Sequence, residues 1–220
     1  MRTRIKFCGL VRPDDVRTAV ALGVDAVGFV FYPQSPRLLD PVQAAGLRRL
    51  LPSYVAAVGL FVNAPEGSIR RVAGAVGLDL IQFHGDEAPR DCEYERPAGL
   101  PYWRAVRIRD RGDLLESFAR FGSAEALLLD SYSVGYGGSG ERFDWSWIPA
   151  ERPMPIVLSG GLSDGTVAAA IAQVRPAMVD VSSGIQLDGP RPDPRAKSRE
   201  RMERFVAAVL RADSARQDSR

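Results

Sequence analysis

The sequence predicts a single-domain (β/α)8 barrel whose functional site lies at the carboxyl ends of its strands. Eight short apolar segments alternate with helix-like segments along the 220 residues, as successive βα units require. Most of these segments lack a polar face, which is typical of parallel strands covered by helices. Several are followed directly by polar residues of kinds that carry chemistry. Because the carboxyl ends of barrel strands meet in one mouth, this order places the chemistry there.

The predicted strands are short and rich in aliphatic and aromatic residues. They are expected at 5–9, 26–31, 55–62, 80–84, 102–108, 126–130, 156–159 and 178–182. A doubly wound open sheet is the alternative architecture, but eight units and a closing helix favour the barrel.

Helices are expected between the strands. Pro13 and two acidic residues open the first, and Gly23 ends it. The others are expected at 41–51, 65–76, 87–95, 111–121, 163–174 and 194–210. Between the sixth and seventh strands, segment 145–148 has room for barely one helical turn before Pro149.

No linker rich in proline, glycine and serine divides the chain. Residues 1–211 are therefore predicted to form one barrel domain, and the small, polar residues 212–220 a frayed tail. The glycine-rich segment 131–139 lies between a strand and the aromatic sequence FDW, and is predicted to be a mobile loop beside the site.

The composition excludes several classes of protein. The 29 basic and 27 acidic residues are spread along the chain, so no nucleic-acid partner is expected. Two cysteines, Cys8 and Cys92, and one histidine provide neither a disulfide framework nor a zinc motif, so no metal is expected. Without a signal-peptide pattern or a run of ~20 apolar residues, we expect a cytoplasmic protein that does not enter membranes.

Two turns of small residues predict a phosphate site. Gly160 and Gly161 follow the seventh strand, and Ser182, Ser183 and Gly184 follow the eighth. In barrels these two loops commonly bind phosphate through backbone N–H groups, which glycine allows to approach closely. Tight turns without a ligand are the alternative, but two of them on neighbouring late strands favour phosphate.

Cys8 and Asp130 are candidates for proton transfer, because each ends an apolar strand. A thiolate at the mouth can abstract a carbon-bound proton, and a carboxylic acid across the barrel can donate one. The alternative for Cys8 is a small apolar core residue, which composition alone favours. The alternatives for Asp130 are a helix cap or a loop salt bridge.

Three further polar residues are candidate ligand contacts. Arg37, in the sequence QSPR, can clamp a carboxylate in a bidentate pair, although a surface arginine is the alternative. Gln82 and His84 flank Phe83, so both point to the same side of a strand, in or near the mouth. A lone histidine is often only a hydrogen-bonded structural residue.

Together these segments resemble phosphoribosylanthranilate isomerase, a family of tryptophan biosynthesis. The matching strings run in order from Lys6 to Ile185: KFCGL, GVDAVGFVFYPQSPR, VGLFVN, IQFHGDE, RAVRI, LLLDSYSVGYGGSGERFDWS, IVLSGGL and VDVSSGI. The sequence departs from the family after the eighth strand, where GIQLDGPRPDP replaces a more usual glycine-lysine-aspartate stretch. The departure therefore falls at the lip of the phosphate site.

The resemblance implies an Amadori rearrangement of N-(5-phosphoribosyl)anthranilate to 1-(o-carboxyphenylamino)-1-deoxyribulose 5-phosphate. It makes Cys8 the general base, Asp130 the general acid and Arg37 the residue that holds the anthranilate carboxylate. The two glycine-bearing turns would hold the phosphate. No cofactor is expected, because the reaction needs no hydride, redox step or metal. The expected partner is this small phosphorylated molecule, bound by a monomer or a homodimer.

Three other functions compete with this one. The related aminoaldose isomerase of the histidine pathway would have an aspartate where this chain has Cys8. An indoleglycerol phosphate synthase would have catalytic lysines at strand ends. We expect no such lysine here, because Lys6 and Lys197 are the only lysines and Lys6 points opposite to Phe7. A non-catalytic barrel that binds a phosphorylated metabolite would not need both the acid and the base.

Overall fold

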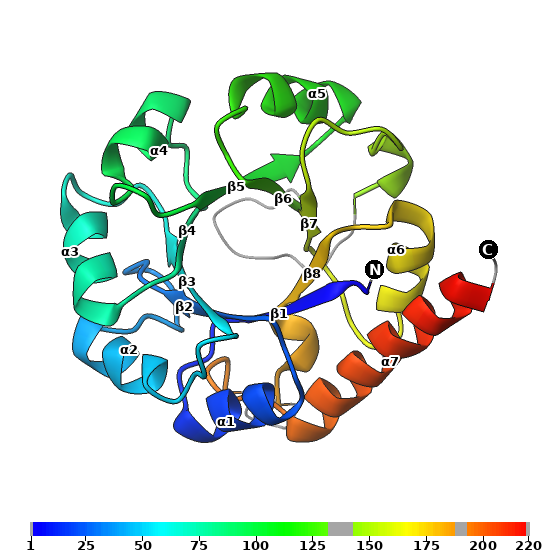
Figure 1. Ribbon diagram of the computed structural model, residues 1–220, viewed down its shortest axis with the longest axis horizontal. Coiled ribbons are helices and arrows are strands. Elements are labelled where there is room, and N and C mark those ends of the chain that lie inside the picture. The colour runs from blue at the N-terminus through cyan, green and yellow to red at the C-terminus, as the bar shows by residue number, and fades with distance from the viewer. Residues whose placement is uncertain (1, 132–142, 188–192, 219–220) are drawn as a thin grey trace.

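The computed structural model is a closed barrel in which each strand pairs in parallel with the next and β1 closes the ring against β8 (Figure 1). The structure describes residues 2–131, 143–187 and 193–218. All eight predicted strands are present, with ends shifted by at most one residue. They are β1 (Arg4–Cys8), β2 (Ala26–Val30), β3 (Ala56–Phe61), β4 (Leu80–Phe83), β5 (Tyr102–Ile108), β6 (Ala126–Ser131), β7 (Ile156–Leu158) and β8 (Met178–Val181).

Helices surround the barrel where the sequence predicted them (Figure 1). They are α1 (Pro13–Ala21), α2 (Pro41–Arg48), α3 (Ser68–Val76), α4 (Pro89–Glu95), α5 (Arg111–Arg120), α6 (Val167–Val174) and α7 (Arg199–Asp218). Proline opens α1, α2 and α4, where its missing N–H costs no helical hydrogen bond. Between β6 and β7 the described residues hold only the 3-10 turn η1 (Trp145–Trp147), as the short segment predicted. A second such turn, η2 (Ser183–Ile185), follows β8.

The last helix differs from the prediction at both ends. The sequence predicted it at 194–210 with a frayed tail at 212–220, but α7 begins at Arg199 and continues to Asp218. The reason is a long-range contact, since the buried carboxylate of Asp213 accepts hydrogen bonds from the backbone N–H and the hydroxyl of Thr3. This pairing ties the extra turns of the helix to Thr3, the residue before β1. Residues 219–220 lie outside the described part of the chain.

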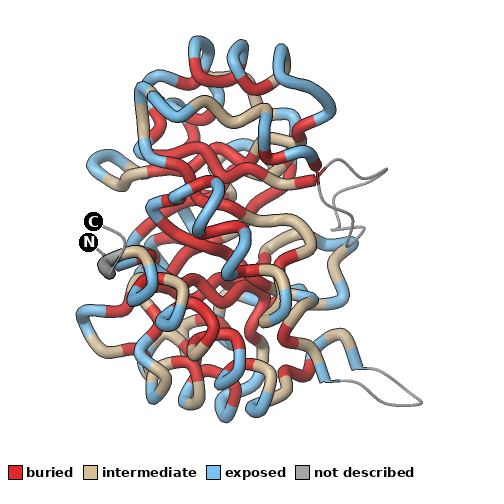
Figure 2. The backbone as a smooth tube through the Cα atoms, turned by 90° about the vertical axis from the view of Figure 1, so that its right-hand side faces the viewer, coloured by how far each residue is buried: buried red, intermediate tan, exposed pale blue. Residues whose placement is uncertain are grey.

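Two hydrophobic layers hold the barrel, one between the strands and the helices and one inside the ring, and both lie in the red core of Figure 2. Side chains alternate between these layers along each strand. On β1, Phe7 points outward and packs against Phe205 of α7, with 6.1 Å between ring centroids. The inner layer is made of Ala26, Val58, Leu80, Trp103, Ala105, Ala126, Leu128, Val157 and Met178.

Lys6 and Cys8 therefore share the inner face of β1. Both are buried, and Lys6 is level with Asp180 in the pairing of β1 with β8. The barrel is thus apolar near the amino ends of its strands and polar toward their carboxyl ends. Across the described residues, no helix is long and apolar enough to cross a membrane.

Candidate active site

A cavity of about 130 Å³ opens at the carboxyl ends of the strands. It gathers residues that are far apart in the sequence, as closure of the barrel requires. Nine of the ten residues that the sequence selected line it: Cys8, Arg37, Gln82, His84, Asp130, Gly160, Gly161, Ser182 and Ser183. The tenth, Gly184, is not among its lining residues. The predicted mobile loop at 131–139 falls, after Ser131, on residues outside the described part of the chain.

Asp130 and His84 face each other in this cavity. His84 Nε2 lies 3.5 Å from Asp130 Oδ2, and the other carboxylate oxygen accepts the backbone N–H of Ser131 at 2.8 Å. Gln82 Nε2 lies 3.0 Å from His84 Nδ1. With the amide nitrogen so placed, it donates to Nδ1, and the ring proton sits on Nε2, toward Asp130. The three polar residues thus form a chain that fixes the carboxylate of Asp130.

Cys8 lies at the end of β1, almost fully buried but lining the cavity. Burial raises the pKa of its thiol above the usual range, because the charged thiolate loses its hydration. The positive charge of Lys6 opposes this effect and lowers the pKa of the same thiol, whereas the carboxylate of Asp180 raises it. The protonation of Cys8 therefore depends on charged groups that the sequence did not select.

Lys6 and Asp180 form an ion pair beside Cys8. Lys6 Nζ donates to Asp180 Oδ1 at 2.8 Å, and the Ser159 hydroxyl donates to the other carboxylate oxygen at 3.3 Å. Burial alone would lower the pKa of Lys6, but the negative charges of Asp180 and Cys8 raise it above its ordinary value. The sequence placed Lys6 on the face of the strand opposite to Phe7 but did not select it as a site residue. Its position two residues before Cys8, on the same face of the strand, was the available signal.

The glycines of the two turns allow close backbone packing. Gly160 and Gly161 have φ of +79° and +63°, a conformation that residues with a Cβ rarely adopt. A Cβ on Gly160 would lie 2.6 Å from the backbone nitrogen of Ser131. Gly184 meets the carbonyl oxygen of Leu162 so closely that a Cβ would collide with it. Gly184 thus brings the turns after β7 and β8 together rather than lining the cavity.

Lys197 lies behind the turn after β8, and sequence reasoning missed it. Its Nζ donates to the carbonyl oxygen of Ser182 at 2.7 Å, and the Ser182 hydroxyl donates to the carbonyl of Cys8 at 3.0 Å. Burial and the positive charge of Arg37 lower the pKa of Lys197 to about 7. Because the chain folds back over 15 residues to make this contact, strand periodicity gave no signal for it.

Arg37 enters the cavity from the loop after β2. Its Nε donates to the carbonyl oxygen of Pro194 at 3.0 Å, and its side chain crosses over Gly9. Among the described residues, its two terminal nitrogens make no hydrogen bond. Both nitrogens can therefore donate to the two oxygens of a carboxylate in a bidentate pair.

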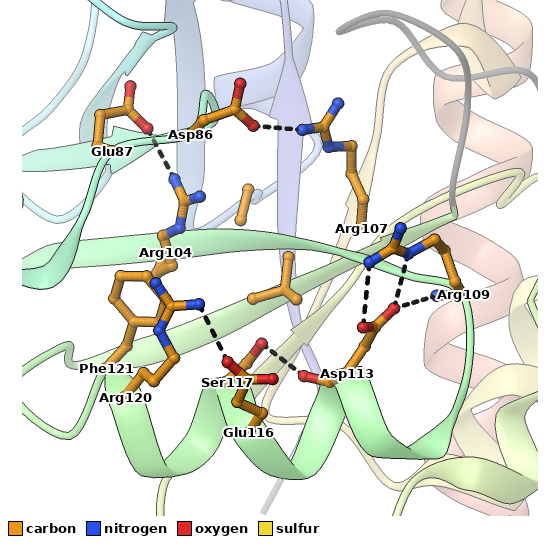
Figure 3. Close-up of a pocket in the computed structure, with 12 residues that line it drawn as sticks. Asp86, Glu87, Arg104, Arg107, Arg109, Asp113, Glu116, Ser117, Arg120 and Phe121 are labelled. Atoms are coloured by element: carbon orange, nitrogen blue, oxygen red, sulfur yellow. Dashed lines mark hydrogen bonds and ion pairs between the residues drawn. The ribbon is translucent and has the colours of Figure 1, made fainter.

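A second, wider cleft of about 530 Å³ lies between the loop after β4, β5 and α5. Figure 3 shows its arginines turned toward neighbouring carboxylates, with the acid and base of each pair in contact. The pairs are Arg104–Glu87 at 2.7 Å, Arg107–Asp86 at 2.6 Å, Arg109–Asp113 at 3.0 Å and Arg120–Glu116 at 3.2 Å. Since these charges neutralise one another and no predicted residue lines the cleft, the smaller cavity at the mouth is the better candidate site.

Groups of three or more histidine, cysteine or acidic side chains that could hold a metal ion are absent from the described residues. The polar groups that line the mouth are instead the thiol of Cys8, the guanidinium group of Arg37, the amide of Gln82, the imidazole of His84, the carboxyl groups of Asp130 and Asp180, and the two small-residue turns. This set suits proton transfer within an anionic ligand.

Comparison with known proteins shows the family of this chain. A family model described as N-(5'phosphoribosyl)anthranilate (PRA) isomerase matches residues 5–206. The N-(5'-phosphoribosyl)anthranilate isomerase of Ralstonia nicotianae is 50% identical over 224 residues, which cover 97% of this chain and 95% of the relative. The protein of the same name from Methylibium petroleiphilum is 48% identical, with 97% of each chain covered.

Solved structures give the same answer. The crystal structure of phosphoribosyl anthranilate isomerase from Thermotoga maritima superposes with a TM-score of 0.86 at 36% identity, covering 94% of this chain and 98% of that one. A second structure of such an isomerase, in complex with reduced 1-(o-carboxyphenylamino)-1-deoxyribulose 5-phosphate, has a TM-score of 0.82 at 34% identity, with the same coverage. By sequence and by fold, this chain belongs to the N-(5'-phosphoribosyl)anthranilate isomerase family.

Proposed function

We propose that the mouth of the barrel converts N-(5-phosphoribosyl)anthranilate to 1-(o-carboxyphenylamino)-1-deoxyribulose 5-phosphate, with Asp130 as general acid and Cys8 as general base. The observation that carries this proposal is that both residues line one cavity, from β6 and β1, in a chain of this family. An acid and a base on opposite sides of one ligand are what an aldose-to-ketose rearrangement needs.

The reaction begins at Asp130. In its protonated form, Asp130 donates to the ribose ring oxygen, the bond between C1 and that oxygen breaks, and the anthranilate nitrogen forms a Schiff base with C1. The neighbouring His84 holds the carboxyl group in place. The proton lost by Asp130 stays on the new C4 hydroxyl group.

Cys8 carries out the second step. As the thiolate it removes the proton from C2, and the electron pair of that bond forms an enolamine with the Schiff base. A proton then adds to C1 and the C2 hydroxyl group loses its proton, which gives the ketone at C2 and completes the isomerisation. A carbon acid of this kind is activated by the protonated Schiff base, so a thiolate is a sufficient base.

The remaining residues bind the two ends of the substrate. Arg37 pairs with the anthranilate carboxylate through its terminal nitrogens. The turns that hold Gly160, Gly161, Ser182 and Ser183 bind the phosphate through backbone N–H groups, and Lys197 lies directly behind them. The relative solved with a reduced phosphorylated product supports this assignment of ligand class.

The chain functions as a monomer or a homodimer. A structure of monomers generated from the dimeric isomerase of Thermotoga maritima is among the similar ones, so both forms have a precedent in the family.

A turnover assay tests this proposal. Freshly prepared phosphoribosylanthranilate is mixed with the protein, and the loss of its anthranilate fluorescence is followed. We expect a rate far above that of the spontaneous reaction and a stoichiometric yield of the carboxyphenylamino product. No turnover by folded protein would contradict the proposal.

A further inference from the structure

Lys6 is the least expected residue beside the mouth of the barrel. Its side chain is fully buried on the inner face of β1, between the apolar layer below and Cys8 above. Burying an ammonium group costs free energy of desolvation, and pairing with a carboxylate offsets this cost only in part. The partner of Lys6 is Asp180, 174 residues away in the chain. Well-packed apolar residues would hold β1 against β8 at least as well.

The sulfur of Cys8 and the ammonium nitrogen of Lys6 face the same small space. A Cβ on Gly28 would lie 2.8 Å from Cys8 Sγ and 3.1 Å from Lys6 Nζ. Gly28 pairs with Cys8 in the register of β1 and β2, so both atoms lie above its backbone. Because Gly28 has no side chain, nothing from this position separates the thiol of Cys8 from the ammonium group of Lys6.

Charged groups approach Cys8 from several elements. Lys6 belongs to β1, Asp180 to β8, and Lys197 to the segment before α7. Arg37, His84 and Asp130 line the same cavity, from the loop after β2, the residue after β4, and β6. Of these groups, Lys6 is the cation whose charge most strongly favours the thiolate.

We propose that Lys6 is a positioning residue whose ammonium group, held in place by Asp180, stabilises the thiolate of Cys8. The role in turnover rests on the proposed function, because the thiolate is there the base that removes the proton from C2. The effect on the thiol itself is independent of the substrate. Lys6 neither touches the substrate nor transfers a proton in this scheme.

The two partners of the ion pair should act on Cys8 with opposite sign. Replacing Asp180 by Asn takes away a negative charge that raises the pKa of the Cys8 thiol, so the thiolate is favoured further. The amide oxygen at that position can still accept from Lys6 Nζ, and the negative charge of Cys8 still favours the charged form of Lys6. Removing both charges together takes away the stabilising cation. A merely structural role for the pair predicts no such reversal, which makes the sign a discriminating observation.

The experiment measures the rate at which iodoacetamide alkylates Cys8 as a function of pH, with mass spectrometry as the readout. The background is Cys92→Ser, which leaves a single thiol. Cys92 lies inside α4, away from the mouth, and burial raises its pKa to about 12, so its removal leaves the site untouched. Asp180→Asn and the double variant Lys6→Met with Asp180→Asn are compared with this background. Circular dichroism establishes that each variant is folded.

We expect the half-point of alkylation to move to higher pH in the double variant, by about one pH unit, equivalent to a roughly ten-fold slower reaction below the half-point. In Asp180→Asn we expect a shift to lower pH. If the double variant does not fold, the direction of the shift in Asp180→Asn decides. An unchanged half-point in the folded double variant, or an upward shift in Asp180→Asn, would overturn the proposal.

Turnover of phosphoribosylanthranilate by the same variants separates this proposal from the proposed function. If the background protein turns over the substrate, the double variant should lose kcat, with an acidic limb of its pH profile that follows the alkylation half-point. If the background protein shows no turnover, the proposed function fails, and the alkylation profiles still decide the effect of Lys6 on Cys8.

Discussion

At the scale of single residues, the site combines features that the sequence revealed with others that it concealed. Cys8 and Asp130 were visible because a reactive or charged residue at the end of an apolar strand needs a reason to be there. Lys6 was concealed because strand alternation only says that it faces away from Phe7, and in a barrel both faces are covered. The charge of Lys6 is paired with Asp180, and only closure of the barrel brings that carboxylate beside it.

Arg37 carries a prediction at this scale. Arg37→Ala should weaken binding of the carboxylate-bearing substrate by about 2 kcal/mol, or roughly 30-fold, because a charge-assisted bidentate pair is lost. Titration with a product analogue, and with the same analogue lacking the anthranilate carboxylate, measures this effect. Arg120→Ala, in the charge-neutralised second cleft, is the matched control and should bind like wild type. Equal losses for both analogues would show that Arg37 does not read the carboxylate.

Lys197 gives a pH-dependent prediction. Its pKa of about 7 leaves it largely neutral at pH 8, where a phosphate monoester is already a dianion. A dianion bound in front of Ser182 raises the pKa of Lys197, so binding at pH 8 should take up protons from the buffer. Calorimetric titration with the product analogue in two buffers of different ionisation enthalpy measures this uptake.

The control for Lys197 is the variant Lys197→Met, which keeps the length of the side chain without its titration. Proton uptake on binding should then largely disappear at pH 8. Should the variant take up as many protons as wild type, another group titrates, and Lys197 does not sense the phosphate.

At the scale of elements, strands were easier to predict than helix ends. Apolar runs bounded by polar residues predict the strands, because each strand is buried along its length and ends where the barrel meets solvent. Helix ends depend on contacts that local sequence does not contain. The extension of α7 to Asp218 relies on hydrogen bonds between Asp213 and Thr3, 210 residues apart. Local sequence therefore did not predict that the helix continues past residue 210.

The turns after β7 and β8 carry a prediction about Gly184. Gly184→Ala places a Cβ against the carbonyl of Leu162, which should lower the free energy of unfolding by about 1–3 kcal/mol and separate the two turns. Denaturant titration measures the loss, and phosphate affinity should fall with it. Gly165→Ala, whose Cβ would meet nothing closer than the Ser163 hydroxyl at 3.8 Å, is the matched control. Equal stability of the two variants would mean that the turns tolerate a side chain at 184.

At the scale of the whole molecule, closure of the barrel makes the site. Cys8 and Asp130 lie on opposite halves of the chain, and the ring of strands places them on the wall of one cavity. The same closure pairs β1 with β8 and so joins Cys8 to the turn at Ser182. Polar residues at the carboxyl ends of successive strands predicted the shared mouth, but the order of side chains around it required the closed structure.

The central claim is that Asp130 donates a proton to the substrate and that Cys8 removes one from it. Turnover by the variants Cys8→Ser and Asp130→Asn tests this claim most directly. Serine is a far weaker acid than cysteine, and asparagine has no acidic proton, so each variant should lose at least about 100-fold in kcat. Binding of the phosphorylated product analogue and the free energy of unfolding should stay near those of wild type. Near-normal turnover by either folded variant would contradict the assignment of that residue as acid or base.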